Sequence, residues 1–331
     1  MATRLATVFG GSGFIGRHVV QRLAAQGWRV RVAVRDTEAA RFLEPRGDVG
    51  QVIPVYADLT KDFSVQAAVH GADLVINLVG ILYPRGKNSF QAIHVDGAGR
   101  IAAAAKAAGV EALVHLSAQG ADPNSPSLYA RSKAAGEAAV RAAFPNAVIL
   151  RPSVVFGPED SFFNRFADLA SYTPVLPVFV SDGFRLFGHA AGICRLFGSG
   201  GFKLQPVFVS DVADAVVTAA LPRFAGKTFA LGGPRVYSFK QVLELVLSAS
   251  GRKRWLIPVP LGIARIKAAF LQYLPNPLLT PDQVKLMSVD NVVPPGSPGL
   301  AELGITPTAA ELIVPTYLSR FQNPHVSATP G

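Results

Sequence analysis

Leu5-Ala-Thr-Val-Phe-Gly-Gly-Ser-Gly-Phe-Ile-Gly16 is the stretch that decides the fold of this 331-residue chain. An apolar strand pattern leads into a glycine turn, and a helical pattern begins directly after it. Gly10 would allow the tight turn, Gly13 would let a pyrophosphate approach the backbone, and Gly16 would let the helix pack against the strand. Free N–H groups at the helix start favour a bound anion. The alternative interpretation is an ordinary glycine-rich turn.

A second strand pattern, with Val30, Val32 and Val34, follows about twenty residues later, where dinucleotide-binding proteins select the ribose. An acidic residue at its end would accept bonds from the 2′-hydroxyl of NAD. Here the strand is followed by Arg35, whose planar donor fork suits the 2′-phosphate of NADP. Asp36 keeps NAD(H) open as the alternative, since its carboxylate could turn inward. We predict that NADP(H) is preferred, against the simpler interpretation of Arg35 as a solvated charge.

Composition restricts the class of protein. With 50% hydrophobic and 16% charged residues, the chain can bury a large core and is not disordered. Its net charge is +10, but no Lys/Arg block of five or more occurs, so nucleic-acid binding is not expected. The excess positive charge favours an anionic membrane surface or an acidic protein partner, unless it serves solubility alone.

The cysteine and histidine content and the lengths of the apolar runs exclude several other classes of protein. Cys194 is the single cysteine, which excludes an internal disulfide and a thiolate metal cluster. The six histidines lack ligand-like spacing, so no metal site is expected. No apolar run reaches about 18 residues, which predicts that no helix spans a membrane. Because the N-terminus leads directly into the first strand, no signal or transit peptide is expected, and we predict a cytoplasmic protein.

Strand and helix patterns alternate in the first part of the chain. Strand patterns cover 5–9, 29–34, 51–56, 73–79, 112–117 and 147–151, and helical patterns cover 14–26, 37–44, 62–70, 90–108 and 127–143. Apolar strands separated by helices indicate a parallel sheet with helices on both faces. The predicted fold class is therefore α/β, a Rossmann-type doubly wound sheet whose ligand lies beyond the carboxyl ends of the strands.

The pattern changes near residue 152. We predict a nucleotide-binding domain over 1–151, a smaller C-terminal substrate or partner lobe interleaved with the sheet over 152–321, and a disordered tail over 322–331. The stretch 157–210 is rich in Phe, Pro and Gly, and residues 177–203 within it are interpreted as a loop or hairpin insert on the substrate side. Periodic patterns resume after it, with helices over 211–221 and 238–250 and a strand near 227–231.

Three residues could carry chemistry. Tyr129 and Lys133 stand four apart at the start of a helical stretch, which puts them on one helix face. The ammonium would lower the pKa of the phenol, so Tyr129 could exchange a proton near neutrality, and Lys133 could also bond the nicotinamide ribose. Ser117 ends the preceding strand, and its hydroxyl could hold a substrate carbonyl. A chance Tyr-x-x-x-Lys is common, so the catalytic interpretation depends on its combination with the glycine turn and Ser117.

This combination resembles the extended and atypical branch of the short-chain dehydrogenase/reductase superfamily. Asp58-Leu59 matches its adenine-contacting pair, Asn77-Leu-Val-Gly80 its cofactor wall, and Arg151-Pro-Ser-Val-Val-Phe-Gly-Pro158 the segment that closes over the nicotinamide. The resemblance implies that Ser117, Tyr129 and Lys133 are the catalytic residues. It implies a cofactor site formed by Gly10, Ser12, Gly13, Phe14, Ile15, Gly16, Arg35, Asp58, Leu59, Leu78, Val79, Gly80, Ser117, Tyr129, Lys133, Pro152, Ser153 and Val154.

A narrower resemblance covers roughly residues 4–320. The segments that carry it are Gly10–Val19, Tyr129–Glu137, Arg151–Asp160 with Phe163–Phe166, Gln205–Ala215, Leu278–Val284 and Asp290–Val293. Together they look like the nucleotide-binding accessory subunit of respiratory complex I and its bacterial relatives, in which bound NADP(H) is regarded as structural. The insert over 177–203 departs from that family's pattern.

The resemblance implies an NADP(H)-binding accessory or assembly subunit of complex I, the NADH:quinone oxidoreductase. Its partners would be complex I subunits or other membrane-complex proteins, and it would lie peripherally on the cytoplasmic face of the inner membrane. Two alternatives stay open. One is an active NAD(P)-dependent reductase, epimerase or dehydratase with Tyr129 as acid/base, linked to quinone metabolism; the other is a redox-sensing regulator.

A basic and aromatic segment supports membrane contact. Bases beside Trp, Phe and Tyr on a short amphipathic helix suit an interfacial position on an anionic membrane surface. The alternative is a helix that buries its apolar face against its own domain. The bases are Arg252, Lys253, Arg254, Arg265 and Lys267, and they surround Trp255–Leu261 and Ile263–Leu274.

Overall fold

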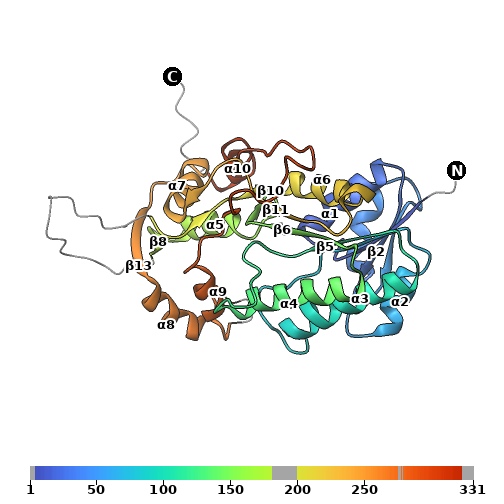
Figure 1. Ribbon diagram of the computed structural model, residues 1–331. Coiled ribbons are helices and arrows are strands. Elements are labelled where there is room, and N and C mark those ends of the chain that lie inside the picture. The colour runs from blue at the N-terminus through green and yellow to red at the C-terminus, as the bar shows by residue number, and fades with distance from the viewer. Residues whose placement is uncertain (1–3, 181–199, 275–276, 278, 323–331) are drawn as a thin grey trace, which may run out of the picture. The chain divides into compact units, whose positions relative to one another are not determined.

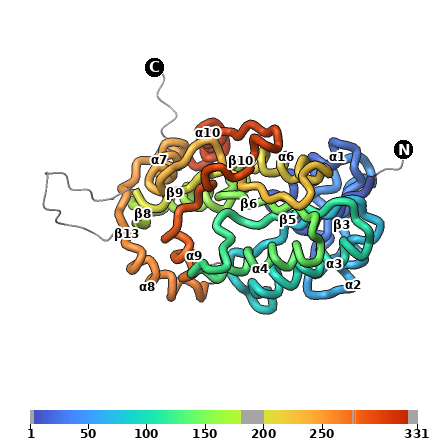
Figure 2. Tube along the Cα trace, in the orientation of Figure 1, coloured from blue at the N-terminus to red at the C-terminus, as the bar shows by residue number. Residues whose placement is uncertain are grey.

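The computed structural model describes residues 4–180, 200–274, 277 and 279–322. Cys194, most of the predicted insert and the tail from residue 323 lie outside the described residues. The chain divides into two compact units. The first contains Met1–Pro152, Val209–Leu231 and Val293–Pro307, and the second contains the remaining segments. Figure 2 traces the chain through both units.

A seven-stranded parallel sheet organises the first unit, with the strand order β11-β6-β5-β4-β1-β2-β3. The α/β prediction of a Rossmann-type sheet is therefore confirmed. The strands are β1 (Leu5–Phe9), β2 (Arg29–Val34), β3 (Val52–Tyr56), β4 (Leu74–Asn77), β5 (Ala112–Leu116), β6 (Val148–Pro152) and β11 (Thr228–Leu231).

Helices cover both faces of this sheet. Helices α1 and α6 lie on one face, and α2, α3 and α4 lie on the other (Figure 1). All four residues of β4 are buried, which explains why the central strands read as continuous apolar runs. The helices are α1 (Phe14–Ala25), α2 (Asp62–Val69), α3 (Gly97–Ala107), α4 (Leu128–Ala143) and α6 (Val209–Ala219), with 3₁₀ turns η1 (Glu38–Arg46) and η3 (Pro222–Phe224).

One predicted helix differs in its first part. Within the predicted range 90–108, residues Gln91–Asp96 form a π-helical segment, η2, before α3 begins. A Cβ on Gly136 of α4 would lie 2.1 Å from the His94 carbonyl oxygen, so α4 packs against η2 at backbone distance. Packing against α4 is a long-range contact, which helical periodicity does not report. Such π segments are frequent near functional sites.

The described part of the second unit holds three two-stranded sheets and five helices around a core rich in phenylalanine, in which the Phe202 and Phe239 rings stack at 5.0 Å. Pro177 to Val180, placed in the predicted insert, belong to β8, which pairs with β13 in parallel. The elements are β7 (Val155–Phe156), β8 (Val175–Val180), β9 (Lys203–Leu204), β10 (Val207–Phe208), β12 (Tyr237–Ser238), β13 (Trp255–Pro260), α5 (Phe163–Tyr172), α7 (Phe239–Ala249), α8 (Leu261–Leu271), α9 (Pro281–Leu286), α10 (Ala310–Leu318) and η4 (Ser319–Phe321).

Local signals set several helix starts. Ser127 caps α4 by accepting from the Ala130 N–H, and Ser238 with Gln241 forms a capping box at the start of α7. In the described parts of the chain, no helix is both long and apolar enough to cross a bilayer.

Candidate functional site

The glycine turn joins β1 to α1. Gly10 has a φ of +77°, a left-handed conformation that glycine adopts without a steric penalty. A Cβ on Gly16 would lie 2.3 Å from the Gly10 carbonyl oxygen, so only glycine lets α1 approach the turn so closely. A Cβ on Gly13 would meet only that same oxygen, at 3.2 Å. The space beside Gly13 is therefore open, as a diphosphate in the turn requires.

The N-terminus of α1 faces this turn. Gly13 is its N-cap, and no side chain among the described residues caps the first-turn N–H groups. The first turn also contains no acidic residue. Ser12 lies in the glycine turn, and Phe14 and Ile15 begin the helix. Uncapped N–H groups and the helix dipole make this end a suitable cradle for an anion.

The carboxyl ends of β2 and β3 bring Arg35 and Asp58 together. The pKa of Asp58 lies below its ordinary value, mainly because the Thr60 N–H donates to it, and the charge of Arg35 contributes. Arg35 is exposed and makes no hydrogen bond or ion pair within the described residues. Asp36 Oδ1 accepts from the Ala39 N–H at 3.0 Å, so this carboxylate caps the start of η1.

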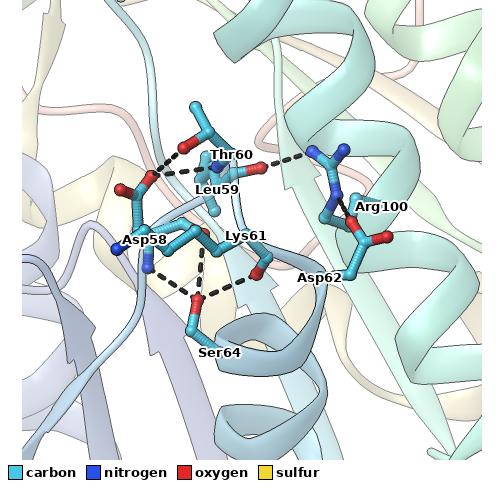
Figure 3. Close-up of polar contacts among 7 residues, drawn as sticks. All are labelled: Asp58, Leu59, Thr60, Lys61, Asp62, Ser64 and Arg100. Carbon is cyan, nitrogen blue, oxygen red and sulfur yellow. Dashed lines mark hydrogen bonds and ion pairs between the residues drawn. The ribbon is translucent and has the colours of Figure 1, made fainter.

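The Asp58 loop is held rigidly from both sides (Figure 3). Asp58 Oδ1 accepts from the Thr60 N–H at 2.9 Å and from its hydroxyl at 2.8 Å. The Asp58 N–H donates to Ser64 Oγ at 3.0 Å, and Ser64 Oγ donates to the Lys61 carbonyl oxygen at 2.9 Å. These bonds fix the backbone where the resemblance places the adenine.

Arg100 of α3 anchors the other side of the same loop. It donates to the Leu59 carbonyl oxygen and pairs with Asp62 (Figure 3). Leu59 itself is buried in the core between the sheet and helices α2 and α3. Arg100 was not predicted from the sequence, because its partners lie about forty residues away and no local pattern connects them.

The loop after β4 touches the glycine turn. A Cβ on Gly10 would lie 3.3 Å from the backbone of both Leu78 and Val79. Asn77 Oδ1 accepts from the Val79 N–H at 3.1 Å and so fixes the loop. A Cβ on Gly80 would lie 3.2 Å from Lys133 Nζ. The structure thus brings the glycine turn, the predicted cofactor wall and α4 together at one edge of the sheet.

Lys133 is buried in this edge. Its Nζ donates to the Leu116 carbonyl oxygen at 3.3 Å. Burial lowers the pKa of Lys133 to about 8, although Glu137 one turn further along α4 opposes the shift. Glu137 is itself held by Arg151 of β6 through two hydrogen bonds of 2.8 and 2.6 Å. At neutral pH Lys133 therefore carries its proton, and its burial makes this charged form cost folding free energy.

Ser117 and Tyr129 lie at the same end of the first unit. The Ser117 hydroxyl is buried and has no hydrogen-bond partner within the described residues. Tyr129 lies in the first turn of α4 and is half-buried. Its ring packs edge-on against His94 at 5.5 Å and Phe90 at 6.0 Å. A buried hydroxyl without a partner is the kind of group that a carbonyl or ribose oxygen would satisfy.

The predicted proton affinity of Tyr129 is wrong. The sequence indicated a phenol whose pKa is lowered by Lys133, whereas burial raises the pKa of Tyr129 to about 12. Desolvation penalises the phenolate, and the Lys133 ammonium donates to the Leu116 carbonyl oxygen. In this structure the phenol keeps its proton at neutral pH.

His94 is a site residue that sequence reasoning did not identify. Its Nε2 accepts from the Ile81 N–H at 2.9 Å, so Nδ1 carries the proton and donates to Ser132 Oγ at 2.8 Å. Ser132 then donates to the Tyr129 carbonyl oxygen at 2.7 Å. Burial, aided by the charge of Lys133, lowers the pKa of His94 to about 3. These hydrogen bonds between uncharged groups fix the helical turn that carries Tyr129.

His115 is a second buried histidine near Lys133. Its Nδ1 accepts from the Asn77 amide at 3.1 Å, and its Nε2 has no partner within the described residues. Burial is the main reason that the pKa of His115 falls to about 3. Two neutral histidines and one ammonium thus line the buried end of the site.

The last predicted segment spans the boundary of the two units. Pro152 ends β6, and its carbonyl oxygen accepts from the Gln119 N–H at 2.8 Å. Ser153 and Val154 belong to the second unit. There Ser153 Oγ donates to Asn291 Oδ1 at 2.5 Å. Their contact with the nicotinamide stays a prediction.

Residues 6–232 match the model of the NAD dependent epimerase/dehydratase family. The chain belongs to this family. Solved structures share its fold: the Thermus thermophilus UDP-glucose 4-epimerase in complex with NAD aligns with 96% of this chain and 98% of its own, with a TM-score of 0.67 and 20% identity. At that identity the likeness concerns the fold alone.

Within the epimerase/dehydratase family, similar sequences include subunits of a respiratory enzyme. The mitochondrial NADH dehydrogenase [ubiquinone] 1 alpha subcomplex subunit 9 of Mus musculus is 36% identical over 93% of this chain and 78% of its own length. The NADH-ubiquinone oxidoreductase 40 kDa subunit of Neurospora crassa is 32% identical over 96% and 80%. A ceramide reductase of Caulobacter vibrioides is 38% identical over 177 residues, 54% of each chain.

Proposed function

We propose that this chain is an NADP(H)-binding accessory or assembly subunit of respiratory complex I, in which the nucleotide is mainly structural. The observation that carries the proposal is the extent of the similarity to complex I subunits. It covers 93% of this chain for the mouse subunit and 96% for the Neurospora subunit, and so includes the second unit. If the chain shared only nucleotide binding with these subunits, we would expect the sequence similarity to be limited to the first unit.

The choice of NADP(H) rests on the end of β2. Arg35 is exposed and has no ion pair within the described part of the chain, so its guanidinium is free to donate hydrogen bonds to a 2′-phosphate. Asp36 is already used at the start of η1, which weakens the case for NAD(H). We propose that Gly13 and the α1 N-terminus hold the diphosphate, and that Asp58 and Leu59 contact the adenine.

The proposed structural role agrees with the state of the buried end. A phenol with a pKa of about 12 and a lysine with a pKa of about 8 both keep their protons at neutral pH. Tyr129 and Lys133 can then donate hydrogen bonds to the nicotinamide ribose. The His94–Ser132 chain would keep Tyr129 in place.

We propose that its partners are complex I subunits or other membrane-complex proteins at the cytoplasmic face of the inner membrane. The test uses a tagged chain in its own cells, with membranes solubilised in a mild detergent. The chain should comigrate with NADH:quinone oxidoreductase activity on native gels, and extraction of the purified complex should yield NADPH or NADP⁺. Migration apart from that activity under all mild detergents would contradict the proposal.

An active reductase is the second candidate, because Ser117, Tyr129 and Lys133 are all present and the Ser117 hydroxyl has no partner in the described residues. Ser117 would hold a carbonyl oxygen, and Tyr129 would give its proton to that oxygen. NADPH, when bound, would supply the hydride. The similarity to a ceramide reductase supports a lipid carbonyl as substrate. Oxidation of NADPH by the purified chain with a carbonyl panel that includes lipid ketones would favour this candidate.

A further inference from the structure

Helix α8 in the second unit has two apolar faces of different kinds. Its buried residues are the small Ala264 and Ala268, and Leu261 at its first position packs partly buried against the core of the unit. Three of its larger apolar side chains, those of Ile263, Ile266 and Phe270, are exposed instead. A helix of a globular domain ordinarily does the reverse, because burying large side chains contributes most to stability.

The outward apolar side chains form one continuous stripe. Ile263, Ile266 and Phe270 follow the i, i+3, i+7 spacing of a single helix face, and Tyr273 continues it beyond the helix end. The exposed fraction is 64% for Ile266 and 75% for Phe270. The alternative raised by the sequence, a helix that buries its main apolar face in its own domain, therefore does not hold for α8.

The chain segment that carries this stripe is positively charged, and the first acidic residue after it is Asp282 in α9. Residues 252–281 contain five Lys/Arg residues and no Asp or Glu, against a net charge of +10 for the whole chain. Arg265 and Lys267 are exposed on α8 itself and form no ion pair with any described residue. Uncompensated bases beside a large apolar stripe are typical of helices that lie in the interface of an anionic bilayer.

The strand that leads into α8 has the same character. In β13, Trp255 is 78% exposed and Ile257 is also exposed, and Lys253 lies exposed just before the strand. Tryptophan and tyrosine favour the level of lipid head groups, where their rings are apolar and their polar atoms remain hydrated. Aromatic side chains therefore stand at both ends of the segment from Trp255 to Tyr273.

We propose that α8 inserts its Ile263–Ile266–Phe270 stripe into the interface of an anionic phospholipid bilayer, with Arg265 and Lys267 on the head groups. The inference specifies the peripheral location that we propose for the chain and depends on no role of the nucleotide. A protein groove would also accept an apolar stripe. The excess of positive charge over residues 252–281 favours lipid phosphates, which are negative everywhere, over a protein surface of mixed charge.

The test measures cosedimentation of the purified full chain with vesicles. One set contains phosphatidylcholine alone, and the other also contains phosphatidylglycerol. We expect binding to the second set, weakened by salt, and little binding to the first. Ile266→Ser with Phe270→Ser should weaken that binding about tenfold or more, and Arg265→Glu with Lys267→Glu should remove the preference for phosphatidylglycerol.

Phe63→Ser is the matched control, because Phe63 on α2 is 67% exposed but lies in the first unit, outside the stripe. It should bind vesicles like the unmodified chain, and circular dichroism should show each variant folded. Equal binding by the Ile266/Phe270 variant, or no binding by the unmodified chain, would overturn the inference. So would a dimer that the same variant dissociates in the absence of lipid. None of these experiments involves complex I, so their outcome does not decide whether the proposed function is correct.

Discussion

The ends of the candidate site that we propose for the adenosine and for the nicotinamide both lie at the carboxyl edge of one sheet, yet they differ in burial. At the proposed adenosine end, Arg35 is exposed, and the pKa of Asp58 is lowered, so the charged form of Asp58 is favoured. At the nicotinamide end, Lys133, His94 and Tyr129 are all shifted toward their neutral forms by burial.

Because of this difference in burial, the exposed end is suited to selecting the nucleotide and the buried end to any reaction. Exposed charges can choose between two nucleotides without altering the fold, since water screens them until the ligand binds. Buried groups are costly to charge, so changing them changes the stability of the whole unit. The two ends should therefore respond differently to substitution, and the glycine turn between them should affect ligand binding at both.

Gly13→Val should have the largest effect on binding, because the added branches would occupy the path of the diphosphate that connects the two ends. We expect NADPH affinity to fall by at least about a hundredfold, with little change in the thermal unfolding temperature of the unliganded chain. Calorimetric titration measures the first, and a melting curve measures the second. Gly16→Val is the contrast, since its Cβ would clash with the Gly10 backbone and should prevent folding. Undiminished NADPH binding by Gly13→Val would show that the turn has another role.

Lys133→Met tests the buried end. The pKa of Lys133 is about 8 in the folded chain against an ordinary value of 10.5, so the unfolded chain binds more protons between these pH values. The unfolding free energy of the unmodified chain should therefore rise from pH 8 to 10.5. At pH 7 the variant should be more stable by on the order of 3 kcal/mol, and this advantage should vanish near pH 10.5.

Urea unfolding without nucleotide, measured across that pH range, provides the comparison. Lys106→Met is the matched control, because Lys106 is exposed in the last turn of α3 and should not change the pH dependence. A Lys133→Met chain that is less stable than the unmodified one at pH 7 would contradict the burial argument.

Arg35→Ala tests the exposed end. It should remove about 1.5–3 kcal/mol of the preference for NADPH over NADH, as expected for charge-assisted bonds to the 2′-phosphate, and should leave stability unchanged. Affinities of both nucleotides for both proteins are needed. Equal affinity of the unmodified chain for NADPH and NADH would reject the assignment of Arg35.

His115→Asn should change how the stability of the chain depends on pH in acid. The pKa of His115 falls from 6.5 to about 3 on folding, so the unfolded chain takes up a proton below pH 6.5 that the folded chain does not. Stability should therefore decrease as the pH falls, and the variant should lose about 1 kcal/mol per pH unit of that dependence. His70→Asn, at an exposed position, is the control and should keep the original slope.

Prediction from sequence succeeded where local pattern determines structure. The glycine turn and the alternating apolar strands specify the parallel sheet, because turn geometry and periodicity are properties of neighbouring residues. The pKa of Tyr129, the bonds of His94 and the exposed stripe of α8 depend on what packs against them from distant segments. Periodicity shows that α8 is apolar, but only the packed structure shows that its alanines face the core.

The central claim is that the nucleotide is needed for structure and that the chemistry of Tyr129 is not needed. It is tested by replacing the native copy of the gene with Tyr129→Phe or Gly13→Val and measuring NADH oxidation by complex I in isolated membranes. We predict near-normal oxidation with Tyr129→Phe, and with Gly13→Val oxidation as low as in cells lacking the chain. A Tyr129→Phe chain that folds, retains NADPH and still fails to support NADH oxidation would contradict the account and favour catalysis.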